Sequence, residues 1–558
     1  MPKRLLGLAI IVALSPALIT TSYAQLHLEI AKAPESAPKI AILPFSNDQS
    51  IYPIIEQDLN RSGRFTSSSK NLPATASVNN VNAEAWKAAG VPYVVLVPAS
   101  RVRTAAHMIS DAIYQALTGI QGDFTGRIAY VLRNPATPDT RYTLQIADTD
   151  GEQPKTVLSS RDPILSPAWT PDAKKIAYVS FETKRPAIYV QDLASGAREK
   201  LASFRGLNGA PSFSPDGKSM LFTASMHGNP EIYQMDLDTR QVKRMTNDSA
   251  IDTEARYAPD GKSFIFTSDR GGSAQIYRYS FDDGSTKRLT FRGAFNARGT
   301  LSADGKYVAL VHRPSGSNYK VAIQEISTGI TNILTPTSLD ESPSFSPNGQ
   351  MVVYATREGN RGLLAIMSTD GRFRMNLPSE QGEEVSEINM KAIQYLTLPL
   401  LAASLVMTGC ASRKPAATVE SGTNPNSATT VNTSGLSEDA ALNAQNLAGA
   451  SAKVSDLSND DYQTLKRMPQ FLIANANSKV ALTGHTDERG TREYNMALGE
   501  RRAKAVESYL ITNGVKPNQL EAVSYGKEMP INAGHDESAW KENRRVEINY
   551  EAVPPLLK

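Results

Sequence analysis

Short apolar runs separated by polar turns recur through the middle of the chain at a spacing of 44 residues. Each turn has a Ser/Ala-Pro/Ala-Asp/Asn-Gly character and precedes a strand pattern such as Met220–Thr223, followed by a second one such as Glu231–Gln234. The equivalent turn positions are Asp172, Asp216, Asp260, Asp304 and Asn348. This period is typical of β-propeller blades. Proline sets the first corner and Asp-Gly supplies a left-handed residue, so we interpret these aspartates as structural and not as a metal site.

A sixth unit opens before these five, because Gly126–Val131 matches the strand at Lys174–Val179. It lacks the Pro-x-Trp-x-Pro strand that precedes another blade. In closed propellers the other end of the chain supplies such a missing strand, which removes the exposed sheet edges. Here that strand should follow Gly382, but Glu383–Asn389 contains no aromatic residue and no proline. We predict a six-bladed propeller over residues 124–382, and the sequence leaves open whether the ring closes or stays open with exposed edges.

The first 120 residues divide into an export signal and a small domain. Lys3 and Arg4 precede an apolar run, and small residues end at Ala24, which predicts a signal peptide over residues 1–24 and a mature chain in the periplasm. Strand patterns at Lys39–Phe45 and Tyr93–Val97 and a helical pattern at Ala105–Leu117 predict a mixed α/β domain over residues 25–120. Two clear strands are few for such a domain, so we expect it to be shortened.

A second signal pattern lies inside the chain, at residues 390–410. Lys391 precedes an apolar run from Leu396 to Met407, and Met-Thr-Gly then leads to Cys410, the only cysteine. The alternative is a buried or membrane-spanning helix, since 392–409 is just long enough to cross a bilayer. We favour the signal, with Cys410 as its lipidation site. Residues 411–450 are rich in Ala, Ser, Thr and Asn, which predicts a flexible linker.

The last part of the chain, residues 451–558, has the pattern of an α/β sandwich. A helical period starts at Asp460, and predicted strands alternate with a long helix over Glu493–Leu510. Asp487 follows the first strand and Arg502 lies on that helix. The two opposite charges together suit a ligand with both an ammonium and a carboxylate, because arginine binds carboxylates through two parallel hydrogen bonds. The alternative is that Asp487 caps a turn and Arg502 lies on a solvated helix face.

Composition narrows the classes of function. The net charge of +3, with 21% charged residues and no basic stripe, argues against nucleic-acid binding. One cysteine and six scattered histidines predict no intramolecular disulfide, no metal site and no cofactor. Propellers of this repeat also precede serine peptidases, which makes a hydrolase the remote alternative. We predict a protein that is not an enzyme, because the chain contains neither a Gly-x-Ser-x-Gly elbow nor a phosphate-binding Gly-x4-Gly-Lys loop.

The export signal, small α/β domain and six blades, over residues 1 to about 382, resemble the TolB family of the Tol-Pal envelope system. The resemblance implies that the propeller face docks peptidoglycan-associated lipoproteins (Pal). It also implies that the segment after the cleaved signal binds TolA-type proteins. That segment consists of Gln25, Leu26, His27, Leu28, Glu29 and Ile30.

Residues 390–558 resemble the Pal family, because Thr483-Gly-His-Thr-Asp487 and the following helix with Arg502 match the OmpA-like peptidoglycan-binding motif. The resemblance implies that Thr486, Asp487, Leu498 and Arg502 bind diaminopimelate in the cell-wall stem peptide. It also implies a lipid anchor at Cys410 in the outer membrane, facing the periplasm. One departure concerns Gly449–Ser458, which lacks the first strand of such domains, so we expect an incomplete pocket.

The two resemblances together imply an envelope scaffold that links the outer membrane to peptidoglycan and maintains envelope integrity during cell division. An uncut membrane helix at 390–410 would leave the second half in the cytoplasm. The positive residues after the apolar run, Arg413 and Lys414, favour that wrong orientation. Both halves can act in the periplasm only if the whole chain crosses the membrane and is anchored or cut at Cys410, or if the second half is made separately from Met390. We therefore predict that the functional material is two polypeptides, with Cys410 lipidated at the start of the shorter one.

Overall fold

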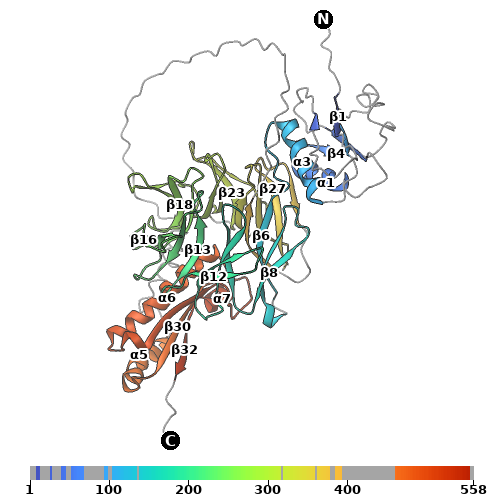
Figure 1. Ribbon diagram of the computed structural model, residues 1–558. Coiled ribbons are helices and arrows are strands. Elements are labelled where there is room, and N and C mark those ends of the chain that lie inside the picture. The colour runs from blue at the N-terminus through green and yellow to red at the C-terminus, as the bar shows by residue number, and fades with distance from the viewer. Residues whose placement is uncertain are drawn as a thin grey trace, which may run out of the picture.

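The computed structural model shows three folded parts, an N-terminal domain, a propeller and a C-terminal domain (Figure 1). The residues it describes are 8–12, 26–27, 39–44, 52–67, 93–97, 103–134, 137–315, 318–337, 339–358, 361–377, 384–391 and 459–552. Among these residues, none of the helices combines the length and the apolar character that crossing a bilayer requires.

The N-terminal domain is a five-stranded sheet, in the order β2-β1-β5-β3-β4, with helices α1 and α3. The elements are β1 (Leu8–Val12), β2 (Leu26–His27), β3 (Lys39–Pro44), α1 (Tyr52–Arg61), β4 (Thr66–Ser67), β5 (Tyr93–Val97) and α3 (Arg103–Thr118). Ile40 and Ile55 lie in its core with Ala106 and Ile113 of α3, which confirms the predicted apolar face of that helix.

Strand β1 lies inside the predicted signal peptide and pairs with β5 in parallel and with β2 in an antiparallel register. The sheet therefore contains more strands than the two that the sequence pattern made clear. An apolar segment can take this position between β2 and β5 because the backbone groups of both strands pair with it. Cleavage after residue 24 stays a prediction, and it would remove β1 from this sheet.

The propeller consists of six four-stranded sheets. Five use consecutive strands: β9 (Ile164–Trp169), β10 (Lys175–Ser180), β11 (Ala187–Asp192), β12 (Arg198–Ala202); β13 (Asn208–Phe213), β14 (Ser219–Ala224), β15 (Glu231–Asp236), β16 (Val242–Arg244); β17 (Asp252–Tyr257), β18 (Ser263–Ser268), β19 (Gln275–Ser280), β20 (Thr286–Arg288); β21 (Phe295–Leu301), β22 (Tyr307–Arg313), β23 (Lys320–Glu325), β24 (Thr331–Ile333); β25 (Glu341–Phe345), β26 (Met351–Glu358), β27 (Arg361–Ser368), β28 (Arg374–Asn376). The predicted turns between the first two strands of these blades are present. At Gly217 and Gly261, φ is +72° and +68°, as a left-handed turn residue requires.

The sixth sheet combines both ends of the propeller segment, in the order β29-β6-β7-β8. Its strands are β6 (Arg127–Arg133), β7 (Tyr142–Asp148), β8 (Lys155–Ser160) and β29 (Glu384–Lys391), and a short 3-10 helix spans Pro138–Thr140. Strand β29 pairs antiparallel with β6 and packs against β9 and β25, the innermost strands of the neighbouring blades. Of the two alternatives that the sequence left open, the structure shows β6 with a paired edge, because backbone pairing does not require the aromatic and proline residues that the pattern lacked.

The six sheets form no hydrogen-bonded barrel, but their innermost strands pack in sequence around a ring. The indole Nε1 of Trp169 donates a hydrogen bond of 3.2 Å to the carbonyl of Asn389, across the seam between two blades. Met390 is buried, and its backbone N–H donates to Ser344 Oγ at 3.2 Å. The first two residues of the predicted internal signal, Met390 and Lys391, thus belong to β29, and the rest of that signal lies outside the described residues.

The C-terminal domain has a three-stranded sheet, in the order β31-β30-β32, covered by helices on one face. The elements are α5 (Asn459–Ala474), β30 (Lys479–His485), α6 (Arg492–Thr512), a 3-10 helix (Pro517–Gln519), β31 (Leu520–Gly526), α7 (Glu537–Asn543) and β32 (Val546–Ala552). Apolar residues of α5 and α6 pack on the sheet around Leu472, Leu482 and Leu510, which confirms the predicted α/β sandwich. The segment Gly449–Ser458, where a first strand was missing from the pattern, lies outside the described residues.

Candidate functional site at the propeller mouth

The C-terminal domain brings its four predicted binding residues together at the end of β30. Thr486 and Asp487 follow that strand directly, and Leu498 and Arg502 lie on α6. Helix and strand approach closely because both carry glycine where they meet: a Cβ on Gly484 would lie 1.8 Å from the carbonyl oxygen of Gly499. All four predicted residues consequently line one cavity of about 50 Å³.

Asp487 is buried and holds two guanidinium groups. Arg489 donates to its Oδ2 at 2.8 Å and Arg544 donates to the same oxygen at 3.0 Å. Burial alone would raise the pKa of Asp487, but the hydrogen bonds and charges of these arginines outweigh it and hold the pKa below its usual value. The backbone N–H of Arg489 also bonds Oδ1 at 3.1 Å, so the turn-capping role considered as an alternative is present alongside the ionic one.

Arg502 does not lie on a solvated helix face, because only 6% of its surface is exposed. Its Nη1 donates to the carbonyl of His485 at 2.8 Å. Burial lowers the pKa of Arg502 to about 10, and the carboxylate of Asp487 acts against that shift. Asp487 and Arg502 therefore form a buried pair of opposite charges around the cavity, as the clamp hypothesis requires.

The propeller forms the other wall of this cavity. Besides residues of the C-terminal domain, the lining contains Gly272, Ser273, Ala274, Phe295 and Tyr319. The rings of Phe295 and Tyr494 meet edge to face, with centroids 5.7 Å apart. A cavity of this volume holds a few water molecules, whereas small-molecule pockets measure about 300–1,000 Å³. In this arrangement the predicted cell-wall site is closed by the propeller.

Helix α6 lies across the propeller mouth, where the innermost strands carry a repeated irregularity (Figure 1). Every innermost strand from β9 to β25 changes register once, at a residue with positive φ. These residues are Ser166, Ala210, Glu254, Arg298 and Ser342, again 44 positions apart. Such bulges re-aim side chains and recur beside functional sites.

Three of the bulge residues surround Glu493 in the first turn of α6. Arg298 forms a buried ion pair with Glu493, and Ser166 Oγ donates to its Oε1 at 2.8 Å. Burial alone would raise the pKa of Glu493, but Arg298 outweighs it and lowers the pKa to about 2. For Glu254, burial and the neighbouring Glu493 carboxylate raise the pKa to about 7. At the propeller mouth the carboxylate of Glu493 thus lies between the guanidinium of Arg298 and the carboxylate of Glu254.

Further along α6, polar contacts alternate with apolar ones. Glu500 accepts hydrogen bonds from Ser225 Oγ and from the backbone N–H of Leu207. Asp269 of the propeller accepts from Tyr494 and pairs with Arg501 at 3.2 Å. The apolar cluster of the two blades β9–β12 and β13–β16 also includes Met496, Ala497 and Leu498 of α6. The helix therefore buries both its charges and its apolar side chains against the propeller.

These propeller residues were not predicted from the sequence, although a signal for them exists. They occur six residues before each repeated turn aspartate or asparagine, at a position where three blades carry serine or alanine. Glu254 and Arg298 are the charged exceptions. A charge that breaks the pattern of a structural repeat indicates a site.

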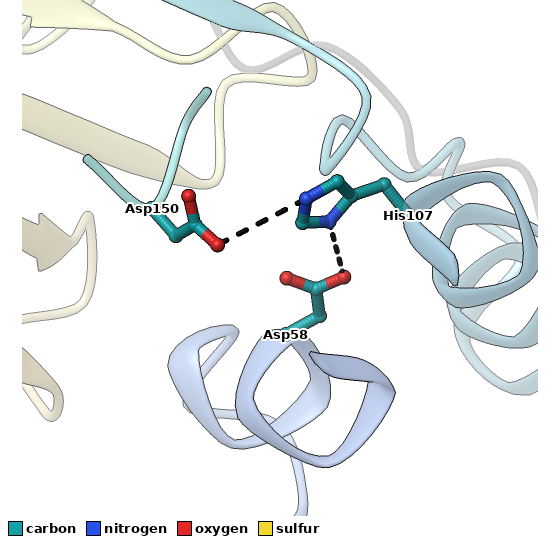
Figure 2. Close-up of side chains that lie close together, drawn as sticks. All are labelled: Asp58, His107 and Asp150. Atoms are coloured by element: carbon teal, nitrogen blue, oxygen red, sulfur yellow. Dashed lines mark hydrogen bonds and ion pairs between the residues drawn. The ribbon is translucent and has the colours of Figure 1, made fainter. Parts of the chain in front are cut away.

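Other predicted residues lie away from this site. Leu26 and His27 form strand β2, whereas Gln25, Leu28, Glu29, Ile30 and Cys410 lie outside the described residues. Asp58, His107 and Asp150 form a buried cluster between the N-terminal domain and the propeller that no sequence pattern predicted (Figure 2). Their positions in the sequence lie 49 and 43 residues apart.

Comparison with protein families gives three matches along the chain. Residues 26–110 match the TolB amino-terminal domain, residues 114–387 match the TolB beta propeller domain, and residues 452–544 match the OmpA family. The matched ranges correspond to the three folded parts. They indicate that domains of two families follow one another in one chain.

Individual proteins are similar to parts of this chain. The Tol-Pal system protein TolB of Acinetobacter baylyi is 80% identical over 413 residues, which cover 68% of this chain and 97% of that protein. The crystal structure of TolB from Acinetobacter baumannii has 77% identity and a TM-score of 0.61, over 66% of this chain and 99% of that one. The peptidoglycan-associated lipoprotein from Burkholderia pseudomallei is 47% identical over 17% of this chain and 80% of that one, with a TM-score of 0.16.

Proposed function

We propose a function for this chain from the family to which it belongs, the TolB family of the Tol-Pal system, extended here by an OmpA-family domain. The chain is a non-enzymatic scaffold of the cell envelope. Its OmpA-family domain binds peptidoglycan through diaminopimelate, and its propeller holds that domain when it is not bound to the wall. Through these two contacts the scaffold links the outer membrane to peptidoglycan during cell division.

One observation carries this proposal: the clamp residues Asp487 and Arg502 share a cavity with propeller residues. A diaminopimelate group needs Arg502 for its carboxylate and Asp487 for its ammonium. It cannot enter while Phe295 and Tyr319 close the cavity. Binding to the wall and docking on the propeller therefore compete, and each weakens the other by the same factor because coupling between two binding events is reciprocal.

Retention on purified cell-wall sacculi tests the proposal. Replacing Arg298 with Ala weakens docking without changing the cavity residues of the OmpA-family domain, so we expect it to increase retention of the full chain. Adding Asp487→Ala or Arg502→Ala should abolish that gain, because each removes the partner of one charged group of diaminopimelate, and truncating one member of a buried charge pair costs about 2–5 kcal/mol. Equal retention of the wild type, the Arg298→Ala variant and both double variants would contradict the site assignment.

A matched control is available at the rim of the same interface. Arg205 pairs with Glu507 at 2.9 Å, but two thirds of the Arg205 side chain is exposed. The Arg205→Ala variant should behave as the wild type in the sacculus assay. If it increases retention as much as Arg298→Ala does, the increase comes from a general change of surface charge.

The remaining parts of the proposed function rest on the sequence. Cys410 becomes the lipidated N-terminus of a shorter polypeptide in the outer membrane, and residues 25–30 bind TolA-type proteins. Labelling cells with a radioactive fatty acid tests the anchor, since a Cys410→Ser variant should lose the label. An antibody to the last domain should detect a product of roughly 16 kDa. A single uncut band that carries no label would contradict both the lipid anchor and the division of the chain into two polypeptides.

A further inference from the structure

Three aspartates and a histidine meet where the N-terminal domain contacts the propeller. Asp58 comes from α1 and His107 from α3, while Asp148 ends β7 and Asp150 lies in the turn that follows. Asp58 and Asp150 are fully buried, and His107 is 3% exposed. Figure 2 shows the imidazole between the carboxylates of Asp58 and Asp150.

The two nitrogens of His107 have different surroundings. Nδ1 lies 2.7 Å from Asp58 Oδ2 and must carry a proton, because a carboxylate only accepts hydrogen bonds. Nε2 is buried without a hydrogen-bond partner, and it faces Asp148 Oδ2 at 3.8 Å and Asp150 Oδ2 at 3.9 Å. In the neutral imidazole its lone pair thus points at two further acceptors, which is unfavourable unless a cation lies between them.

We propose that a divalent transition-metal ion of the zinc type binds between His107 Nε2 and the carboxylates of Asp148 and Asp150. An imidazolium N–H would bond an oxygen at about 2.7–3.2 Å, so the longer distances suit an ion better than a proton. Ligand atoms about 2.0–2.1 Å from a tetrahedral zinc lie roughly 3.3 Å apart, which a small side-chain rotation achieves. The imidazole ligand favours zinc-type ions over calcium or magnesium.

Asp58 does not contact the ion but holds the His107 ring that binds it. A histidine ligand usually donates its other ring N–H to a carboxylate, which fixes the ring and makes the ligating nitrogen more basic. Arg61 donates to Asp58 Oδ1 at 3.1 Å and to Thr149 Oγ1 at 3.0 Å, so this carboxylate is itself held in place. The site is therefore preorganised across the domain junction.

Arg103 is the competitor for the ion. Its guanidinium contacts Asp150 Oδ2 and Asp148 Oδ2, the two oxygens that the ion would use. The cluster contains three carboxylates, Asp58, Asp148 and Asp150, and two guanidinium groups, Arg61 and Arg103. It therefore carries one net negative charge when the imidazole of His107 is neutral. The side chain of Arg103 is 21% exposed and can turn into solvent. A divalent ion in its place makes the cluster neutral.

Titration of the full chain with zinc chloride, after treatment with a chelator, tests the site. The wild type should bind one more ion than His107→Gln, and cobalt should give visible absorption bands that this variant lacks. Asp58→Asn should weaken binding about 10–100-fold, as loss of such a supporting carboxylate does. Arg103→Gln should bind several-fold more tightly, whereas a purely structural role of Arg103 predicts no gain.

His535→Gln is the control, because His535 is half exposed and lies in the C-terminal domain. Circular dichroism establishes that each variant is folded. Should His107→Gln unfold, Arg103→Gln and the cobalt bands of the wild type still decide the matter. Equal stoichiometry in the wild type and His107→Gln, or the absence of any gain in Arg103→Gln together with absent cobalt bands, would overturn the proposal.

Discussion

The propeller contacts the C-terminal domain at its mouth and the N-terminal domain at a second junction, and buried charges have different partners at the two junctions. At the mouth, each buried carboxylate of α6 meets a partner on the propeller, as Glu493 meets Arg298 and Glu500 meets Ser225. At the N-terminal junction, carboxylates outnumber guanidinium groups and His107 Nε2 has no hydrogen-bond partner. At the first junction each of these two carboxylates has a partner on the propeller through one oxygen, although Oε2 of Glu493 and of Glu500 accepts no hydrogen bond from the described residues, whereas the second junction gains from a cation. The two junctions therefore differ in which side chains partner the buried carboxylates, and not in whether carboxylates are buried.

Removing one partner at the mouth should have the largest effect. Arg298→Ala leaves Glu493 as a buried carboxylate without its cation, and breaking such a pair costs about 3–5 kcal/mol. A protease site inserted within residues 411–450 would release the last domain, and calorimetric titration would measure its affinity for the propeller. An unchanged dissociation constant would show that the ion pair does not hold the two domains together.

Removing a cation at the N-terminal junction should have a smaller effect. Arg61→Ala deprives Asp58 and Thr149 of buried hydrogen bonds, which should lower the free energy of unfolding by about 1–3 kcal/mol. Thermal unfolding measures the loss, with Arg64→Ala as the control because Arg64 is exposed. If both variants lower the midpoint equally, the balance of charge at this junction is not what stabilises it.

A change of pH should separate the two carboxylates at the mouth. Docking places Glu493 beside Glu254 and contributes to raising the pKa of Glu254 to about 7, so this pKa is lower in the undocked propeller. The contribution of Glu254 is complete below its undocked pKa and is lost as the pH rises through about 7. The pKa of Glu493 is lowered to about 2. Its contribution to docking is therefore complete at any pH above the ordinary pKa of a glutamate, and it is lost only as the pH falls toward about 2.

Between pH 6 and pH 8 docking should therefore weaken, by at most about tenfold, because Glu254 with a docked pKa of about 7 can release no more than one proton over this range. The Glu254→Gln variant should show a flat profile over the same range. A wild-type affinity that rises with pH, or a Glu254→Gln variant with an unchanged slope, would assign the dependence to another group.

The smallest effect is expected at the rim. Arg205→Ala should weaken docking by less than about 1 kcal/mol, because the Arg205 side chain in its pair with Glu507 is 66% exposed. The effect should vanish at high salt, where exposed charges are screened. A loss as large as that of Arg298→Ala would mean that burial does not distinguish these two pairs.

The sequence predicted those elements whose cause is local. The Ser-Pro-Asp-Gly turns are visible because proline and glycine satisfy backbone requirements at fixed positions, as at Gly217. The approach of Asp487 and Arg502 was predictable from a strand followed by a helix. In contrast, β29 has no side-chain signature, because its place depends on the unpaired backbone of β6 more than 250 residues earlier.

Most contacts between domains could not be predicted for a similar reason. Nothing near His107 in the sequence points to Asp58 or Asp150, since only the docking of α1, α3 and β7 brings them together. The closing of the cell-wall cavity by Phe295 and Tyr319 likewise depends on how two domains meet. The periodicity of apolar and polar residues predicts which side chains form the core of a domain, but it says little about which other domain contacts its surface.

The position of Met390 in β29 restricts where this polypeptide can be divided in the cell. A peptidase that cuts before Cys410 leaves all eight residues of β29 with the propeller. A nick before Glu384 would instead transfer the strand to the other product and leave β6 without its neighbour. Proteolytic maturation and a complete propeller are therefore compatible only when the cut falls downstream of Lys391.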